Sequence, residues 1–385
     1  MKRSTDRILT THVGSLIRPP ELLEFSTARR EGRRIDQQTF EKCLREAVDD
    51  VVRKQVEAGI DIVSDGEFGK SSWAAYVLER LSGFEVRRDQ IIPLHWLGRD
   101  LDRFHDFFEE ESGGSMLRGA ATEVCVGPIA LTDHASLARD IDNFKHALGH
   151  SQPKEAFITA VAPASTAYNG VNEYYPSDKE YVYAIADALR EEYQTVYKSG
   201  LLLQVDDAVL ANMYDYLISQ SPEHYREWAQ LRVDALNHAL QGIPEDRVRY
   251  HICFGSWHVP HVADAPLPAI IDLVLQVNAG AYSFEAANPR HEHEWTVWQG
   301  RKLADGKSII PGIVTHHTTI VEHPELVAQR IVRFAGLVGR ENVIAGTDCG
   351  FAQGAFTQRV HPQVMWAKFA SLVEGARIAS EQLWR

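Results

Sequence analysis

Eight short apolar runs, each followed by a stretch with helical periodicity, limit what this chain can fold into. The runs are rich in β-branched residues and end in glycine or polar residues: ILTTHVGS, IDIVSDGE, AFITAVAPAS, LLLQVDDA, RYHICFGS, AYSFEAAN, SIIPGIVTHH and VIAGTDCG. Alternating strands and helices are typical of a parallel α/β sheet. None of the runs leads into a dinucleotide-binding or Walker-type glycine motif, so a (β/α)8 TIM barrel is favoured over an open doubly wound sheet.

The stretches between the runs have the boundaries of amphipathic helices. In residues 177–200, Ser177 is placed to cap the first turn and Gly200 follows the last one. Residues 221–242 and 361–384 show a similar pattern. These signals predict helices on the outside of the barrel.

Length and one irregular segment define the expected domain organisation. At 385 residues, the chain fits one catalytic barrel over 1–385. Residues of about 87–122, after the second strand, form a long excursion rich in aromatic and charged residues, and VCVGPIAL adds an extra strand-like piece. Long insertions of this kind build a lid over a site or an oligomer contact, and the sequence leaves both open, including a homo-oligomer.

Charge and hydropathy exclude several classes of partner. The net charge of −13 argues against nucleic acid and against an anionic membrane surface. No run of eighteen apolar residues is present, and the N-terminal MKRSTDRILTTHVG lacks a signal-peptide core, so we expect a cytoplasmic protein. In a reducing compartment the four cysteines are not expected to form disulfides. Cys43 and Cys125 fit core positions, whereas Cys253 and Cys349 stand beside polar groups where strands end.

Ionisable residues gather at the ends of the predicted strands, which in a barrel meet on the face that carries the active site. The set comprises His12, Ser15, Asp65, Glu67, Asp206, Asp207, His251, Cys253, Glu285, His316, His317, Asp348 and Cys349. Four of these residues have the chemistry of zinc ligands, namely His251, Cys253, Glu285 and Cys349. His251 and Cys253 are two apart, so on a strand both point to the same face. H-x-C alone is a weak signal, but the strand ends at Glu285 and Cys349 favour a Zn²⁺ site.

Several motifs, in order, resemble those of one family. ILTTHVGSLIRP, IVSDGE, LQVDDA, HIC, SFEAANPRHEHEW and TDCG are similar to the cobalamin-independent methionine synthase family, over nearly the whole chain. The match corresponds to the C-terminal catalytic barrel, of the methionine synthase/uroporphyrinogen decarboxylase-like type. HICFGSWHVPHVAD and VEHPELVAQRIVRFAGLVG look like its short members, which include epoxyalkane:coenzyme M transferase.

The resemblance implies roles for the strand-end residues. His251, Cys253, Glu285 and Cys349 would bind zinc, which holds a small thiol as a thiolate that attacks an electrophilic alkyl donor. Ser15, Glu67 and Asp206 would contact the thiol substrate; we expect Asp206 also to be catalytic and Asp207 to bind substrate. Either His316 or His317 would be the general acid, the alternative for His317 being a solvated loop residue. Arg18 is either an anion clamp or a surface residue.

Two departures from the family pattern bear on the substrate. The family's tryptophan that packs on the folate is absent from TAVAPASTAYNG, where Tyr168 is the nearest aromatic residue. DEP has become DDA at residues 206–208. The sequence therefore predicts a zinc-dependent thiol alkyl- or methyltransferase. Two alternatives stay open: an epoxide:thiol transferase or C–S lyase, and a barrel whose zinc is purely structural.

Overall fold

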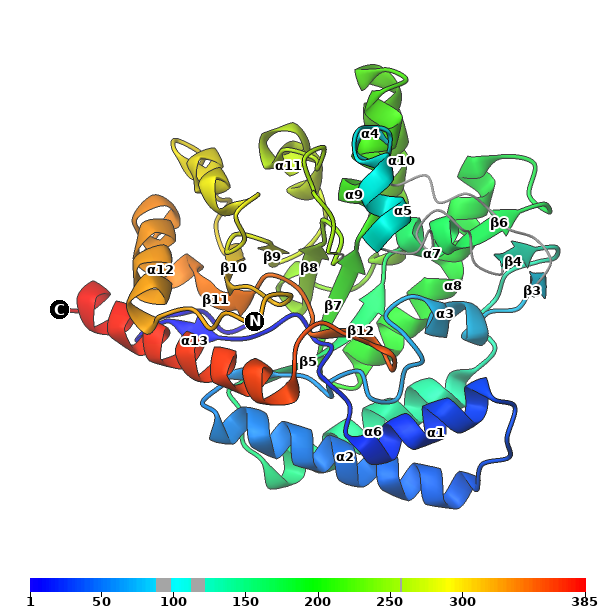
Figure 1. Cartoon of the computed structure of the whole chain (residues 1–385), viewed down its shortest axis with the longest axis horizontal. Helices are drawn as coiled ribbons and strands as arrows, with labels where there is room; N and C mark the ends of the chain where they lie inside the picture. Colours follow the sequence, from blue (N-terminus) through cyan, green and yellow to red (C-terminus); the bar gives the residue numbers. More distant parts are fainter. Residues whose placement is uncertain (88–97, 112–121, 257) are drawn as a thin grey trace.

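A computed structural model describes residues 1–87, 98–256 except 112–121, and 258–385, and its centre is a barrel of parallel strands (Figure 1). Around the barrel the strands follow the order β1-β11-β10-β9-β8-β7-β5-β2, and a bridge between Thr11 and Ile62 closes it. The predicted TIM barrel is confirmed, and each of the eight apolar runs contributes one strand. The strands are β1 (Leu9–Thr10), β2 (Ile62–Val63), β5 (Glu155–Val161), β7 (Leu202–Asp207), β8 (Val248–Ile252), β9 (Ala281–Phe284), β10 (Ser308–Val314) and β11 (Ile344–Thr347).

Amphipathic helices cover the outside of the barrel (Figure 1). Ser177 accepts a hydrogen bond from Glu180 N and so caps α8, and Gly200 follows that helix with a φ of 91°, as predicted. The helices are α1 (Pro20–Arg30), α2 (Gln37–Glu57), α6 (His134–His150), α8 (Asp178–Lys198), α9 (Val209–Ile218), α10 (Pro222–Ala239), α11 (Leu267–Val274), α12 (Pro324–Val338) and α13 (Pro362–Leu383). Short 3₁₀ turns occur at Glu245–Arg247, Glu292–Trp298 and Arg340–Asn342.

The interior of the barrel changes from apolar to polar along the strands. A cluster of buried apolar side chains fills the end where the strands begin: Leu9, Ile62, Phe157, Leu202, Ala281, Ile310 and Ile344. Strand β8 places Arg249 at this level, with its guanidinium 3.8 Å from the centre of the Phe157 ring and donating to Thr11 Oγ1 and His12 O. Residues two and four positions further along each strand face the same way. The barrel is therefore packed below and leaves its polar groups for the carboxyl end.

The excursion after the second strand adds a small separate sheet. After α3 (Ala75–Arg80), strand β3 (Phe84–Arg87) pairs antiparallel with β4 (Thr122–Cys125), and β4 pairs parallel with β6 (Gly170–Asn172), which follows α7 (Pro163–Asn169). Residues 88–97 and 112–121 of the predicted insertion lie outside the described residues. Between them run α4 (Arg99–Arg103) and α5 (His105–Glu111).

The first of these helices docks on the rim of the barrel. Arg99 Nε donates to Asp215 Oδ1 on α9 (2.6 Å), and Asp100 accepts from Val262 N after strand β8 (2.8 Å). Part of the insertion therefore lies at the carboxyl end of β7 and β8, beside α9 (Figure 1). A lid and an oligomer contact both stay predictions.

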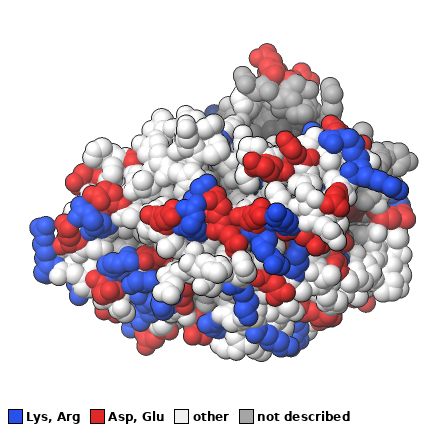
Figure 2. All heavy atoms as spheres, turned by 90° about the horizontal axis from the view of Figure 1, so that it is seen from below, with Lys and Arg blue, Asp and Glu red and all other residues white. Residues whose placement is uncertain are grey.

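The surface seen from below carries acidic and basic side chains side by side (Figure 2). Acidic and basic groups are therefore intermixed on that face. Within the part of the chain that the structure describes, no helix is both long and apolar enough to cross a membrane.

Candidate active site

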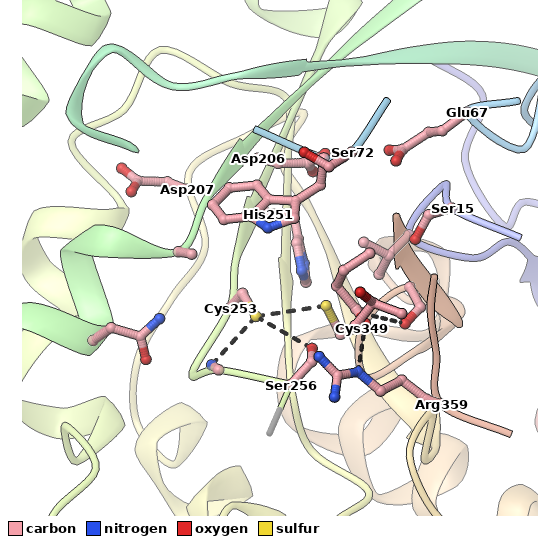
Figure 3. A pocket seen from close by; sticks show the side chains of 18 residues that line it. Ser15, Glu67, Ser72, Asp206, Asp207, His251, Cys253, Ser256, Cys349 and Arg359 are labelled. Carbon is pink, nitrogen blue, oxygen red and sulfur yellow. Dashed lines mark hydrogen bonds between the residues drawn. The ribbon is translucent and has the colours of Figure 1, made fainter. Parts of the chain in front are cut away.

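His251, Cys253 and Cys349 meet at the carboxyl end of the barrel (Figure 3). One potential ligand atom from each lies within 4.8 Å of the others, and the two Sγ atoms are 3.5 Å apart. Both cysteines are free thiols. His251 faces inward from β8, Cys253 follows the same strand, and Cys349 comes two residues after the end of β11. The inward H-x-C arrangement predicted from the sequence brings these residues together.

The environment of the three residues fits a metal ion. His251 Nδ1 lies 3.1 Å from Ser283 Oγ, which orients the ring, while its buried Nε2 has no hydrogen-bond partner. A ring fixed through one nitrogen presents the other as a ligand. The adjacent Cys253 thiol and burial raise the pKa of Cys349 well above its usual range. Cys349 is buried and Cys253 is half-buried, so a cation beside the two sulfurs is needed to keep both as thiolates, and a His-Cys-Cys donor set suits zinc.

Glu285, the fourth predicted ligand, follows β9 but is not part of this group of three. Its Oε1 accepts from Phe254 N (3.1 Å) and its Oε2 from Asn288 Nδ2 (2.8 Å). Burial, and then the carboxylate of Asp348, raise the pKa of Glu285 well above its usual range. The carboxylate is thus held by two donors, one of them the amide of the residue that follows Cys253. Its role as a ligand stays a prediction.

Asp348 anchors the turn that carries Glu285. Its Oδ1 accepts from Ala286 N and Ala287 N, both at 2.8 Å. Gly312 on β10 makes this possible, because a Cβ there would lie 2.1 Å from Asp348 Oδ1 and 2.5 Å from Asp348 Cα. Because Gly312 has no side chain, the carboxylate of Asp348 fits beside β10 and can hold the turn that carries Glu285.

A cavity of about 270 Å³ opens onto the three potential metal ligands, and Ser15, Glu67 and Asp206 line it. Glu67 has a φ of 61°, and its Oε1 accepts from Thr159 Oγ1 (2.7 Å). Burial raises the pKa of Asp206 to about 7, while Gln204 Nε2 donates to its Oδ1 (2.8 Å). The cavity therefore joins a thiol pair to the buried carboxyl group of Glu67 and the half-buried one of Asp206.

Two predicted substrate-binding residues are engaged within the protein. Asp207 lines the cavity, but it accepts hydrogen bonds from Val209 N (3.0 Å), Leu210 N (3.1 Å), Ser165 Oγ (3.1 Å) and Tyr250 OH (3.0 Å). It thereby starts α9. Arg18 is buried and donates to the carbonyl oxygens of Glu67 (2.7 Å) and Lys70 (2.8 Å), so its interpretation as a surface residue was wrong. Arg18 is not among the described residues that line the cavity.

The two candidate general acids follow β10, and His316 contacts a residue of the cavity wall. His316 is buried, and its Nε2 is 3.0 Å from Oγ of Ser256, which does line the cavity. Burial lowers the pKa of His316 well below its usual range and that of His317 to about 4. His317 is half-buried, and neither histidine lines the cavity in the described part of the chain. Both are neutral at pH 7, and the assignment of the general acid stays a prediction.

A comparison with protein families identifies the family of this chain. The model of a family described as "Cobalamin-independent synthase, Catalytic domain" matches residues 8–94 and 166–368. The chain belongs to this family. Among its relatives is the methionine synthase of Thermococcus kodakarensis, 23% identical over 379 residues, which cover 98% of this chain and 94% of that protein. The methionine synthase of Sulfolobus acidocaldarius is 23% identical over 377 residues, 97% and 93% of the two chains.

Solved structures show the same fold. A B12-independent methionine synthase from Shewanella sp. W3-18-1, in complex with selenomethionine, superimposes with a TM-score of 0.73 at 18% identity, covering 98% of this chain and 99% of that one. A putative B12-independent methionine synthase from Listeria monocytogenes gives 0.67 at 21% identity, covering 97% and 98%. The predicted family is confirmed, and membership of the cobalamin-independent synthase family supports a methyl-transfer activity for this chain.

Among the cavity residues that the sequence does not predict, Arg359 carries a charge. Arg359 lines the cavity beside Cys349, yet it belongs to no strand-end motif. It follows the ribbon formed by β12 (Ala352–Gly354) and β13 (Thr357–Gln358), which pair antiparallel. These strands have only two or three residues and therefore no recognisable periodicity. The local sequence thus does not predict that Arg359 lies at the site.

Proposed function

We propose that this protein is a zinc-dependent transferase that alkylates a small thiol, with methyl transfer from an electrophilic donor as the reaction. The observation that carries the proposal is the His251–Cys253–Cys349 group, in which the buried, unpartnered Nε2 of His251 lies beside two thiols that open into the cavity. Membership of the cobalamin-independent synthase family supports the same reaction class.

Some residues of the site would bind the metal, and others would contact the substrate. His251, Cys253 and Cys349 would hold zinc, which when bound lowers the pKa of an incoming thiol. Ser283 orients the His251 ring for that role. We expect Glu285 to be a weaker, exchangeable ligand, because Phe254 N and Asn288 Nδ2 already hold its two oxygens. X-ray absorption of the zinc-loaded protein should show one more sulfur ligand after thiol addition; an unchanged sulfur count would contradict this.

The carboxyl groups of the cavity would contact the substrates. Glu67 is buried and Asp206 is half-buried, and both face the same cavity, so they suit hydrogen-bond donors or positively charged groups of the thiol or of the methyl donor. Ser15 presents a hydroxyl to the cavity from the turn after β1. That turn lies close to Gly350, where a Cβ would be 2.0 Å from Ser15 Oγ, so any side chain at residue 350 would displace the hydroxyl.

Metal analysis of Cys349→Ser tests the proposal most directly. We expect the wild-type protein to bind one zinc and Cys349→Ser to bind it at least tenfold more weakly and to lose thiol consumption. Cys43→Ser is the matched control, because Cys43 lies half-buried on α2, outside the cavity. A screen for thiol disappearance should cross homocysteine and other small thiols with methyl-folate, sulfonium compounds and epoxides. If zinc is bound but no thiol is consumed with any donor, the proposal fails.

A further inference from the structure

We infer that Arg359 is the anion-recognition residue of the cavity, and that the thiol substrate is a compact molecule bearing a carboxylate or a sulfonate. This inference rests on the proposed function, because it assumes that the thiol of the substrate binds to zinc held beside Cys253 and Cys349. Among the described residues that line the cavity, Arg359 is the only arginine or lysine.

The guanidinium lies at the thiol pair. Figure 3 shows the Arg359 side chain extending toward Cys349 and Ser256. Its Nε donates to an amide oxygen of the same ribbon, and no carboxylate of the described residues forms an ion pair with the guanidinium. A guanidinium without a carboxylate partner, at the wall of a cavity, is placed to receive an anion that enters with the substrate.

The surrounding ribbon holds this side chain in place. Arg359 Nε donates to Gln353 Oε1, and Gln353 Nε2 donates in turn to Gly350 O (2.7 Å). The backbone is fixed as well, because Arg359 N donates to Phe351 O (2.9 Å) and Trp73 N donates to Gln353 O (2.9 Å). No hydrogen bond of the described residues uses the two Nη groups of Arg359, which remain for a ligand. A guanidinium oriented in advance loses little entropy when it binds an anion.

The position of the acidic groups narrows the substrate class. Glu67 and Asp206 lie on one side of the thiol pair, and Arg359 lies on the other (Figure 3). An α-amino acid thiol carries its ammonium and its carboxylate on one carbon. If the acids held the ammonium, the carboxylate would stay on their side and away from Arg359. A short thiol with an anionic group and no ammonium can instead extend from the thiol pair toward Arg359.

Calorimetric titration of the zinc-loaded protein tests this without relying on turnover. The probes are 3-mercaptopropionate, 2-mercaptoethanesulfonate, the neutral 2-mercaptoethanol, cysteamine and homocysteine. We expect the two anionic thiols to bind about 10- to 100-fold more tightly than 2-mercaptoethanol, the range of one charge-assisted hydrogen bond. Comparing the first two probes distinguishes a carboxylate from a sulfonate. In Arg359→Gln this advantage should disappear while 2-mercaptoethanol binds as before.

Two further variants make the outcome decisive. Arg359→Lys keeps the charge but loses the planar fork, so it should retain part of the preference. Arg30→Gln is the matched control, because Arg30 stacks on Phe356 of the same ribbon, with its guanidinium carbon 4.0 Å from the ring centre. Zinc content verifies that each variant keeps its site.

Three results would overturn the inference. If Arg359→Gln weakens every thiol equally, the arginine balances the charge of the metal site. If wild type prefers homocysteine to both anionic thiols, the substrate is an amino acid. If thiols bind without regard to charge, Arg359 recognises nothing in them. Absence of binding by any thiol to zinc-loaded protein is a different result, because it removes the proposed function itself.

Discussion

Replacing Gly312 with alanine should disturb the active site from a strand that contributes no ligand. The new Cβ would lie 2.1 Å from Asp348 Oδ1, 2.5 Å from Asp348 Cα and 2.7 Å from Asp348 N, so two of the three contacts involve backbone atoms. Overpacking of this kind costs about 1–3 kcal/mol. If the carboxylate moves away from one of the two amides that it accepts from, a further ~1.5–3 kcal/mol is lost. We expect the free energy of unfolding to fall by about 2.5–6 kcal/mol.

Chemical denaturation, followed by circular dichroism with and without zinc, measures this effect. Gly336→Ala is the matched control, because that Cβ would meet nothing within 4 Å and the residue lies in α12. The control should gain about 0.5–1 kcal/mol, since alanine is the better helix former. Gly312→Ala should also bind zinc more weakly, because Asp348 holds the turn of Glu285. A loss of less than about 0.5 kcal/mol, with normal zinc binding, would refute the argument that Gly312 makes room for Asp348.

Two further predictions concern buried ionisable groups. Burial lowers the pKa of His12 to about 3 in the folded chain, against about 6.5 when unfolded, so the unfolded state binds the additional proton between these values and stability falls as the pH falls below 6.5. His12→Asn should therefore reduce the loss of stability between pH 7 and pH 5.5 by about 1 kcal/mol, and equal slopes in wild type and variant would contradict this. Arg80 pairs with Asp140 (2.7 Å) and Glu192 (3.5 Å) in the interior. Arg80→Ala should cost about 3–5 kcal/mol in denaturant unfolding, whereas the exposed Arg53→Ala should cost less than about 1 kcal/mol; similar values for the two would refute the role of burial.

The strands and the thiol–imidazole group could be predicted because their signals are local. Each barrel strand is a short apolar run buried on both faces, and parallel strands bring their carboxyl ends to one rim. His251 and Cys253 share a face through their spacing alone. The position of Glu285 could not be read in this way. It depends on hydrogen bonds from Phe254 N and Asn288 Nδ2, which exist only once two neighbouring turns have packed together.

The features that sequence reasoning missed depend on contacts between distant segments. Strand β6 has three residues and is defined by its pairing with β4, from which α6, β5 and α7 separate it in the sequence. Arg359 reaches the cavity because the ribbon before it folds back onto residues 72 and 73. Neither position carries a periodic pattern or a turn motif that predicts its partner. Tertiary packing alone places them.

The pairing of β1 with β11 has a consequence for how the chain is made. Leu9 pairs with Ile344, so β1 is synthesised long before this neighbour and finds it only when nearly all of the barrel has been made. Until then its edge stays open, and contacts so distant in sequence form slowly. Ser15, in the turn after β1, hydrogen-bonds through its carbonyl to Phe351 N and thus reaches its final place with the same event. The binding cavity should therefore be absent from nascent chains that end before β11, even though the barrel strands from β2 to β10 could already be paired with one another.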